Sequence, residues 1–121
     1  MQTTPSSERL HIALLGRYNS GKSTLMNALT AQQTAIVSAE PGTTTDPVKK
    51  AMELLPLGPV LIIDTPGLDD EGELGLLRVK KARRVLAQTD IAILVVDGTR
   101  GLSALDQTLL EEFRERNLPH I

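Results

Sequence analysis

The sequence predicts an α/β fold in which helices cover both faces of a mostly parallel sheet. Short apolar runs, typical of buried strands, occur at residues 10–15, 60–63 and 91–96. Apolar residues at helical spacing occur at residues 23–31, 74–88 and 103–116. With a further strand-like segment at residues 48–55, the order is β-α-β-β-α-β-α, which is typical of layered α/β domains.

The first expected elements are bounded by turn residues. Gly16 stops the first apolar run, and a glycine-containing loop leads from it into the helix at residues 23–31. Residues 34–46 are rich in Thr, Ser, Gly and Pro without periodicity, which predicts a loop. A turn signal at residues 56–59 separates two strand-like segments that are close enough in sequence to form a hairpin.

The last expected elements have the clearest boundaries. The run Ile-Ala-Ile-Leu-Val-Val at residues 91–96 is the clearest buried strand in the chain. Ser103 opens the last helix with Asp106 in its first turn, and residues 117–119 end it.

Composition indicates one ordinary domain and excludes several functions. The 121 residues are 40% hydrophobic, 23% charged and 2% aromatic, and they include no Cys. The lack of Cys excludes disulfides and a Cys-held iron–sulfur cluster on this chain. A net charge of −2 and scarce aromatics argue against nucleic-acid binding, and no apolar run is long enough for a membrane span. We expect a disordered lead-in at residues 1–8, one domain at residues 9–121, and a cytoplasmic location.

A phosphate-binding loop lies between the first strand and the first helix. The pattern G-x-x-x-x-G-K-S/T is matched by Gly16-Arg17-Tyr18-Asn19-Ser20-Gly21-Lys22-Ser23. Its glycines let backbone N–H groups approach phosphates, and the helix N-terminus adds unpaired donors. We expect Lys22 to reach the β- and γ-phosphates and the Ser23 hydroxyl to ligate Mg²⁺. The alternative is a structural glycine turn with an exposed lysine, but the strand-loop-helix context favours the phosphate loop.

Two later segments fit a switch that senses the γ-phosphate. Asp64-Thr65-Pro66-Gly67 directly follows a strand, so Asp64 can hold the hydration shell of Mg²⁺ and the Gly67 N–H can reach the γ-phosphate. Before it lies a Thr-rich segment, residues 41–46, in which a hydroxyl can complete Mg²⁺ coordination. Alone, the two segments resemble an ordinary turn and a solvated loop. Together with the phosphate loop they predict a P-loop nucleotide hydrolase.

The three segments in this order resemble translation-factor-class GTPases, in the branch of the Era-like and tRNA-modification (TrmE-like) GTPases. The resemblance is closer still to the GTPase domain of the FeFe-hydrogenase maturation factors, the HydF family. It covers residues 9–121 and is carried by residues 41–48, 52–60, 64–72 and 77–81. The wider branch usually has Arg where this chain has Thr45. The resemblance implies a Ras-like G domain, here truncated after the fourth strand and its following helix, with GTP, GDP and Mg²⁺ as ligands.

The resemblance also assigns roles to individual residues. The phosphates would be held by Asn19, Ser20, Gly21, Lys22, Ser23 and Thr24. The first switch would run from Ser38 to Thr44 and include Thr43, and the second would be Asp64, Thr65, Pro66 and Gly67. Mg²⁺ would be bound by Ser23 and Thr44, and by Asp64 through water. Lys22, Thr44 and Gly67 would act in catalysis, and Asn19 would help to bind K⁺, so potassium activation is a hypothesis.

The chain departs from the family pattern in ways that change the expected chemistry. Leu68 stands where Ras-like enzymes carry a water-orienting Gln, so we expect slow intrinsic hydrolysis. The Asn-Lys-x-Asp motif that reads guanine in this class is absent, so guanine specificity is implied by the resemblance alone. Residues 91–96 would be left as an apolar sheet edge of the kind that promotes aggregation. We therefore expect a piece of a longer protein. The resemblance to the HydF family implies dimerisation and cluster-binding domains beyond Ile121.

Three functions stay open at this point. The first is a GTP-hydrolysing switch domain of a hydrogenase maturation factor, with other maturation proteins or the hydrogenase as partners. The second is an Era-like or TrmE-like GTPase in tRNA modification or ribosome assembly, although nothing in this chain is basic enough to bind RNA. The third is a nucleotide-binding regulatory module with little turnover, which is consistent with Leu68 and the missing guanine motif. Thr45 and residues 52–60 favour the first.

Overall fold

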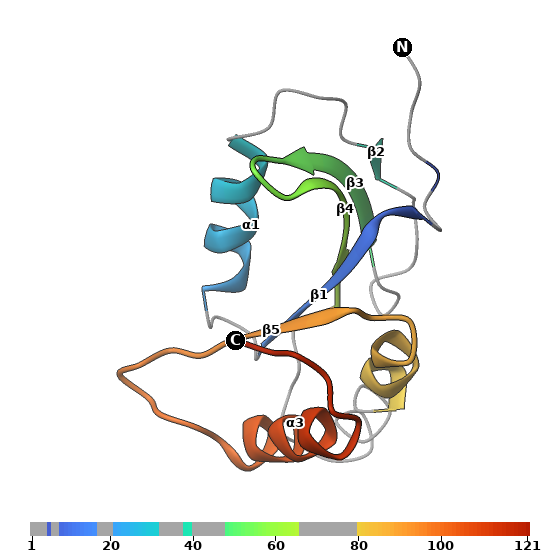
Figure 1. The fold of residues 1–121 in the computed structure, drawn as a ribbon. Coiled ribbons are helices and arrows are strands. Elements are labelled where there is room, and N and C mark those ends of the chain that lie inside the picture. Colours follow the sequence, from blue (N-terminus) through green and yellow to red (C-terminus); the bar gives the residue numbers. More distant parts are fainter. Residues whose placement is uncertain (1–4, 6–7, 17–20, 32–37, 40–47, 66–79) are drawn as a thin grey trace.

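A five-stranded mixed sheet organises the molecule (Figure 1). The computed structural model describes residues 5, 8–16, 21–31, 38–39, 48–65 and 80–121. The strand order is β2-β3-β4-β1-β5, with bounds β1 Leu10–Gly16, β2 Ser38–Ala39, β3 Val48–Leu54, β4 Gly58–Asp64 and β5 Ile91–Val95. β1 is parallel to both of its neighbours, whereas β3 is antiparallel to β2 and β4. The predicted α/β architecture and the predicted β3–β4 hairpin are both confirmed.

Helices cover both faces of this sheet (Figure 1). The helix α1, Lys22–Ala31, lies on one face. A helical segment at residues 80–86 and the helix α3, Ala104–Glu115, lie on the other. The helix expected at residues 74–88 is therefore confirmed over residues 80–86, and residues 74–79 lie outside the described part of the chain.

Each face has its own hydrophobic core, because alternate residues of a strand point to opposite faces. Beneath α1, Met26 packs on Ile12, Leu14, Met52, Leu54, Val60 and Ile62. The second core joins Ala13, Leu15, Leu61, Ile63 and Ala92 to Ala82, Val85, Leu86, Leu109 and Phe113 of the two helical elements. Val60, Ile62, Leu14 and Leu15 are completely buried, so the centre of the sheet is a rigid support for the loops at its ends.

The start of α3 is fixed by a capping box. The sequence predicts that Ser103 opens this helix with Asp106 in its first turn. The Ser103 side chain accepts a hydrogen bond from the backbone N–H of Asp106, and Asp106 Oδ2 accepts one from the backbone N–H of Ser103 at 2.9 Å. Asp106 is almost completely buried. Two N–H groups that a helix N-terminus leaves unpaired are therefore satisfied within this turn.

The expectation that residues 91–96 form an exposed edge is only partly correct, because β5 is the last strand of the sheet but the chain end covers part of it. After α3, Asn117 adopts a left-handed conformation with a φ of 52°, and the Leu118 N–H bonds to the Phe113 carbonyl. This turn returns the chain alongside β5. Ala92 N–H donates to the Pro119 carbonyl at 2.9 Å, and Leu94 N–H donates to the Ile121 carbonyl at 3.0 Å. The pairing around His120 is parallel, and Figure 1 shows the C-terminus beside β5.

Candidate functional site

The candidate site lies where β1 and β4 end, next to the start of α1. Gly21 precedes α1 with a φ of 101°, a backbone conformation that only glycine adopts without strain. The Gly21 carbonyl accepts the helical hydrogen bond from the Leu25 N–H at 3.0 Å. The first residue of α1 is then Lys22.

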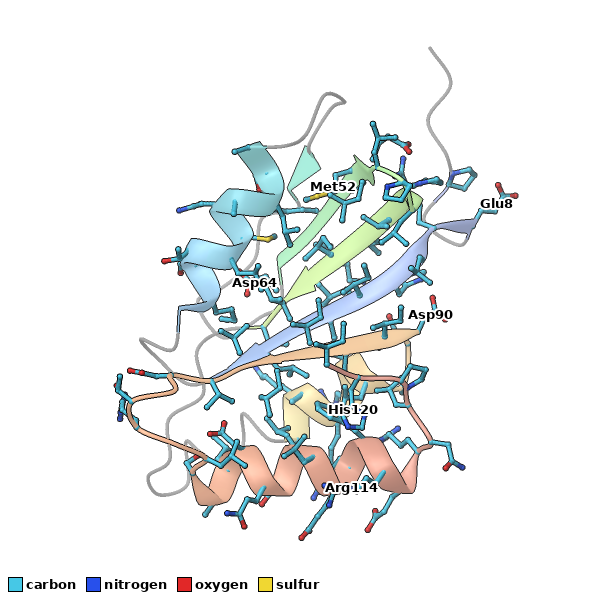
Figure 2. All side chains as sticks on the ribbon, turned by 60° about the vertical axis from the view of Figure 1, so that its left-hand side comes forward. Glu8, Met52, Asp64, Asp90, Arg114 and His120 are labelled. Atoms are coloured by element: carbon cyan, nitrogen blue, oxygen red, sulfur yellow. The ribbon has the colours of Figure 1, made fainter. Side chains whose placement is uncertain are left out.

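Lys22 is buried and is held by residues at the end of β4. Its Nζ lies 2.9 Å from Asp64 Oδ1, and it donates a hydrogen bond to the Thr65 carbonyl. The Lys22 side chain is only 10% exposed, whereas that of Asp64 is 28% exposed. Figure 2 shows Asp64 close to α1. The structure thus brings together two residues that sequence analysis assigned to different motifs more than forty positions apart.

Thr65 fixes the end of β4 against the central strand. Its N–H and its hydroxyl both donate to the Leu14 carbonyl, at 3.3 and 3.0 Å. Leu14 also pairs in register with Asp64 across the parallel ladder. Because Thr65 is 4% exposed, water does not compete for these bonds. The acceptors around Lys22 are therefore held in place by backbone contacts of the sheet.

The oxygen atoms at the end of β4 and the start of α1 are suitable ligands for a magnesium ion. Asp64 Oδ1 is buried and has no hydrogen-bond partner among the described residues, although it is within ion-pair distance of Lys22. The next residue of α1, Ser23, is exposed and carries a hydroxyl. Mg²⁺ prefers hard oxygen ligands and is commonly bound through one or two carboxylates together with substrate phosphates. Among the described residues, no group of three or more His, Cys, Asp or Glu side chains could hold a metal ion.

The structure places only some of the predicted site residues. Gly21, Lys22, Ser23, Thr24, Asp64 and Thr65 lie at this edge of the sheet, and Ser23 and Thr24 are exposed. Ser38 belongs to β2, but its side chain is not among the parts that the structure describes. Outside the described residues lie Asn19, Ser20, Thr43, Thr44, Pro66 and Gly67. Their assigned roles remain predictions.

Sequence analysis predicted Thr65 as a site residue but missed Leu14 and the way Thr65 holds Lys22, because both act through backbone carbonyls. The Leu14 carbonyl holds Thr65, and the Thr65 carbonyl holds Lys22. A carbonyl gives no residue-type signal, so motif patterns do not reveal it. The only available signal was the position of Leu14 near the end of a buried strand beside the phosphate loop.

Comparison with known proteins identifies the family. The family model described as "50S ribosome-binding GTPase" matches residues 11–121. The chain belongs to this GTPase family. The match covers the strand before the phosphate loop, α1, the hairpin and α3, so the fold is that of a P-loop GTPase domain of the Era, TrmE and Der type. None of the helices in the described part is long and apolar enough to cross a membrane.

The relatives of this chain include GTPases with different names. The chain is 43% identical over 98 residues to the tRNA modification GTPase MnmE of Heliobacterium modesticaldum, covering 80% of this chain and 21% of that protein. It is 38% identical over 112 residues to the GTPase Der of Xanthomonas campestris, covering 91% of this chain and 24% of that protein. The chain therefore spans about a quarter of the length of these curated relatives.

Solved structures of the GTPase Era share the fold. Aquifex aeolicus Era bound to GDP and aluminium fluoride superposes with a TM-score of 0.67 at 29% identity, over 92% of this chain and 38% of that one. Another structure of Era contains MgGDPNP and a segment of 16S ribosomal RNA, and it superposes with a TM-score of 0.68 at 30% identity and the same coverage.

Proposed function

We propose that this chain binds GTP with Mg²⁺ and hydrolyses it as a molecular switch. The observation that carries the proposal is the meeting of Lys22 and Asp64, 2.9 Å apart, at the carboxyl ends of β1 and β4. In open α/β sheets, ligands bind outside the carboxyl ends of strands where the chain turns to opposite sides of a central strand. β1 is such a strand, because β4 lies on one side of it and β5 on the other.

The residues of this site supply the parts that phosphoryl transfer needs. Lys22 would neutralise charge that develops on the β- and γ-phosphates. Ser23 and Thr44 would hold Mg²⁺ directly and Asp64 would hold it through water, while the metal supplies Lewis-acid stabilisation of the phosphates when it is bound. The Gly67 N–H would bind the γ-phosphate, so that hydrolysis releases Gly67 from the nucleotide. The Leu68 side chain cannot orient water, and this supports a slow intrinsic rate.

The cellular role that we propose is GTP-dependent control of tRNA modification or ribosome assembly. MnmE is named for tRNA modification, and one Era structure holds a segment of 16S ribosomal RNA. The chain's own net charge of −2 argues against RNA contact through this segment. Its proposed role is therefore the conformational switch that depends on the bound nucleotide.

A second candidate is hydrogenase maturation. It is supported by Thr45 and by residues 52–60, which resemble the HydF pattern more than the wider branch. Residues 52–60 lie in the β3–β4 hairpin, where Leu55 and Leu57 are exposed. In this case the GTP-dependent partners would be other maturation proteins or the hydrogenase.

The first experiment measures GTP binding and turnover together. Wild-type protein, Lys22→Ala and a control Lys80→Ala, an exposed lysine in the helical segment 80–86, are titrated with GTP and ATP in Mg²⁺. We expect wild type and Lys80→Ala to bind GTP and to release phosphate, and Lys22→Ala to lose tight binding. Equal GTP affinity for wild type and Lys22→Ala would reject the site. Binding without phosphate release would identify a regulatory module instead of an enzyme.

A further experiment separates the two cellular roles. The protein at its natural length is loaded with GTP or GDP and mixed with tRNA, ribosomal subunits or purified hydrogenase maturation proteins. GTP-dependent association with tRNA or ribosomal subunits is expected for the first role. Association with the maturation proteins alone would favour the second.

A further inference from the structure

Arg9 is a buried cation at the amino end of β1. Its side chain is 7% exposed, and its Nη1 donates to the Met52 carbonyl at 3.1 Å and to the Val60 carbonyl at 3.4 Å. Glu53 Oε1 lies 3.8 Å from the same nitrogen. A buried guanidinium is strongly unfavourable without acceptors, so these oxygens stabilise its charge. One side chain thus ties the start of β1 to both strands of the β3–β4 hairpin.

The two carbonyls that bind Arg9 lie at one place in the hairpin. Met52 of β3 and Val60 of β4 are opposite each other in the antiparallel ladder, and Val60 also pairs with Leu10 at the start of β1. Because Met52 and Val60 are almost completely buried, water cannot readily replace a lost hydrogen bond to Arg9. A guanidinium carries its donors in a fixed plane. Arg9 therefore favours one position of the hairpin along β1.

The opposite end of the same hairpin borders the candidate site. Val48 and Asp64 form the last pair of the ladder, four pairs from the contacts of Arg9, or about 13 Å along the strands. Asp64 lies 2.9 Å from Lys22 and opens the predicted second switch, whereas the predicted first switch precedes β3. Because β3 and β4 are paired over their full length, a shift of the hairpin at Arg9 is carried to both switch segments.

We propose that Arg9 is a positioning residue for GTP hydrolysis, which fixes the β3–β4 hairpin, and with it both switch segments, relative to the phosphate loop. This proposal rests on the proposed function. Ligands of open α/β sheets bind at the carboxyl ends of the strands, so Arg9, at the amino end of β1, acts through the hairpin. Loss of its donors should misplace the groups that meet the γ-phosphate and leave the phosphate loop as it is.

The test is Arg9→Met, which keeps an apolar side chain and removes the donors. GDP affinity, KM for GTP and kcat are measured on the protein at its natural length, per folded molecule. We expect kcat to fall by about fivefold to twentyfold, because small misplacements of reacting groups slow a reaction strongly. GDP affinity and KM should stay within about twofold of wild type, since both depend on the phosphate loop. Arg9→Lys should restore part of kcat, because its ammonium can still donate to a carbonyl.

Two control variants separate positioning from a general loss of stability. Arg114→Met removes an exposed guanidinium from α3 and should leave kcat and KM unchanged. Asp106→Ala weakens the capping box of α3 and should lower the melting temperature without lowering kcat of the folded protein. A purely structural role for Arg9 would give the same pattern as Asp106→Ala.

Failure of the proposed function and failure of the positioning role give different results. A wild type that neither binds nor hydrolyses GTP would overturn the proposed function, and the positioning role with it. If wild type is active, a wild-type kcat for folded Arg9→Met, or a parallel loss of GDP affinity and kcat, would overturn the positioning role alone. If Arg9→Met does not fold, Arg9→Lys decides: a reduced kcat at unchanged GDP affinity supports the role, and a wild-type kcat overturns it.

Discussion

Arg83 Nε lies 2.7 Å from Glu112 Oε1, and this ion pair joins the helical segment 80–86 to α3. The other carboxylate oxygen of Glu112 lies 3.3 Å from Arg116 Nε on the same helix. Glu112 is 15% exposed at its side chain, whereas Arg83 is 47% exposed. The contact therefore sits at the rim of the core that the two helical elements share.

Replacing Glu112 with Gln should lower the free energy of unfolding by about 0.5 to 1 kcal/mol, because two guanidinium groups lose their charged partner. Urea denaturation of wild type and variant measures the difference, and added salt should shrink it. Glu111→Gln, one position earlier and exposed, is the control and should have little effect. Equal losses for the two variants would indicate a general charge effect on α3.

Removing the Asp106 side chain should lower the free energy of unfolding more than Glu112→Gln does. Asp106→Ala leaves the Ser103 N–H without the acceptor at 2.9 Å, and we expect a loss of about 1 to 2 kcal/mol in the free energy of unfolding. Asp106→Asn keeps an amide oxygen in the same place and should recover part of the loss. A neutral Asp106→Ala would show that the Asp106 side chain contributes nothing to stability.

Thr44 and Thr43 can be separated by their effects on turnover. Thr44→Ala should leave GDP binding intact while impairing GTP hydrolysis, because Thr44 is expected to reach Mg²⁺ only when the γ-phosphate is bound. GDP affinity and phosphate release are measured for Thr44→Ala and Thr43→Ala side by side. If Thr43→Ala impairs hydrolysis and Thr44→Ala does not, the assigned register is off by one residue.

Asn19 gives a prediction about monovalent cations. If Asn19 helps to bind K⁺ beside the phosphates, initial GTP turnover should be faster in KCl than in NaCl at equal ionic strength. Asn19→Ala should bring the KCl rate close to the NaCl rate. Equal wild-type rates in the two salts would remove K⁺ from the mechanism and leave the compensation for Leu68 to another residue or a partner.

Most of the fold was predictable because the buried strands are encoded locally. The apolar runs that became β1 and β5 are interrupted by few polar residues, and Ser103 with Asp106 marks the start of α3 in the sequence itself. β2 escaped prediction, since a two-residue strand has no periodicity to detect. The pairing of the chain end with β5 was also not predicted, because it depends on the turn at Asn117 and on backbone hydrogen bonds of residues 119–121.

The candidate site was predictable as a list of residues but not as a set of contacts. The phosphate-loop pattern identified Lys22, and its position after a strand identified Asp64. That these two side chains pair with each other follows from the parallel register of β1 and β4, which no local pattern contains. The role of the Thr65 carbonyl depends on the same register.

The central position of β1 also has a consequence for how the chain folds. Ile12 pairs with Ile62 on one side and with Ile91 on the other, so both ladders of this strand join segments that are far apart in sequence. The β3–β4 hairpin, in contrast, closes through a short turn. Contacts between distant segments form slowly because a long loop must close first. During synthesis β1 and α1 therefore leave the ribosome early, yet they complete their sheet only after β5 has emerged.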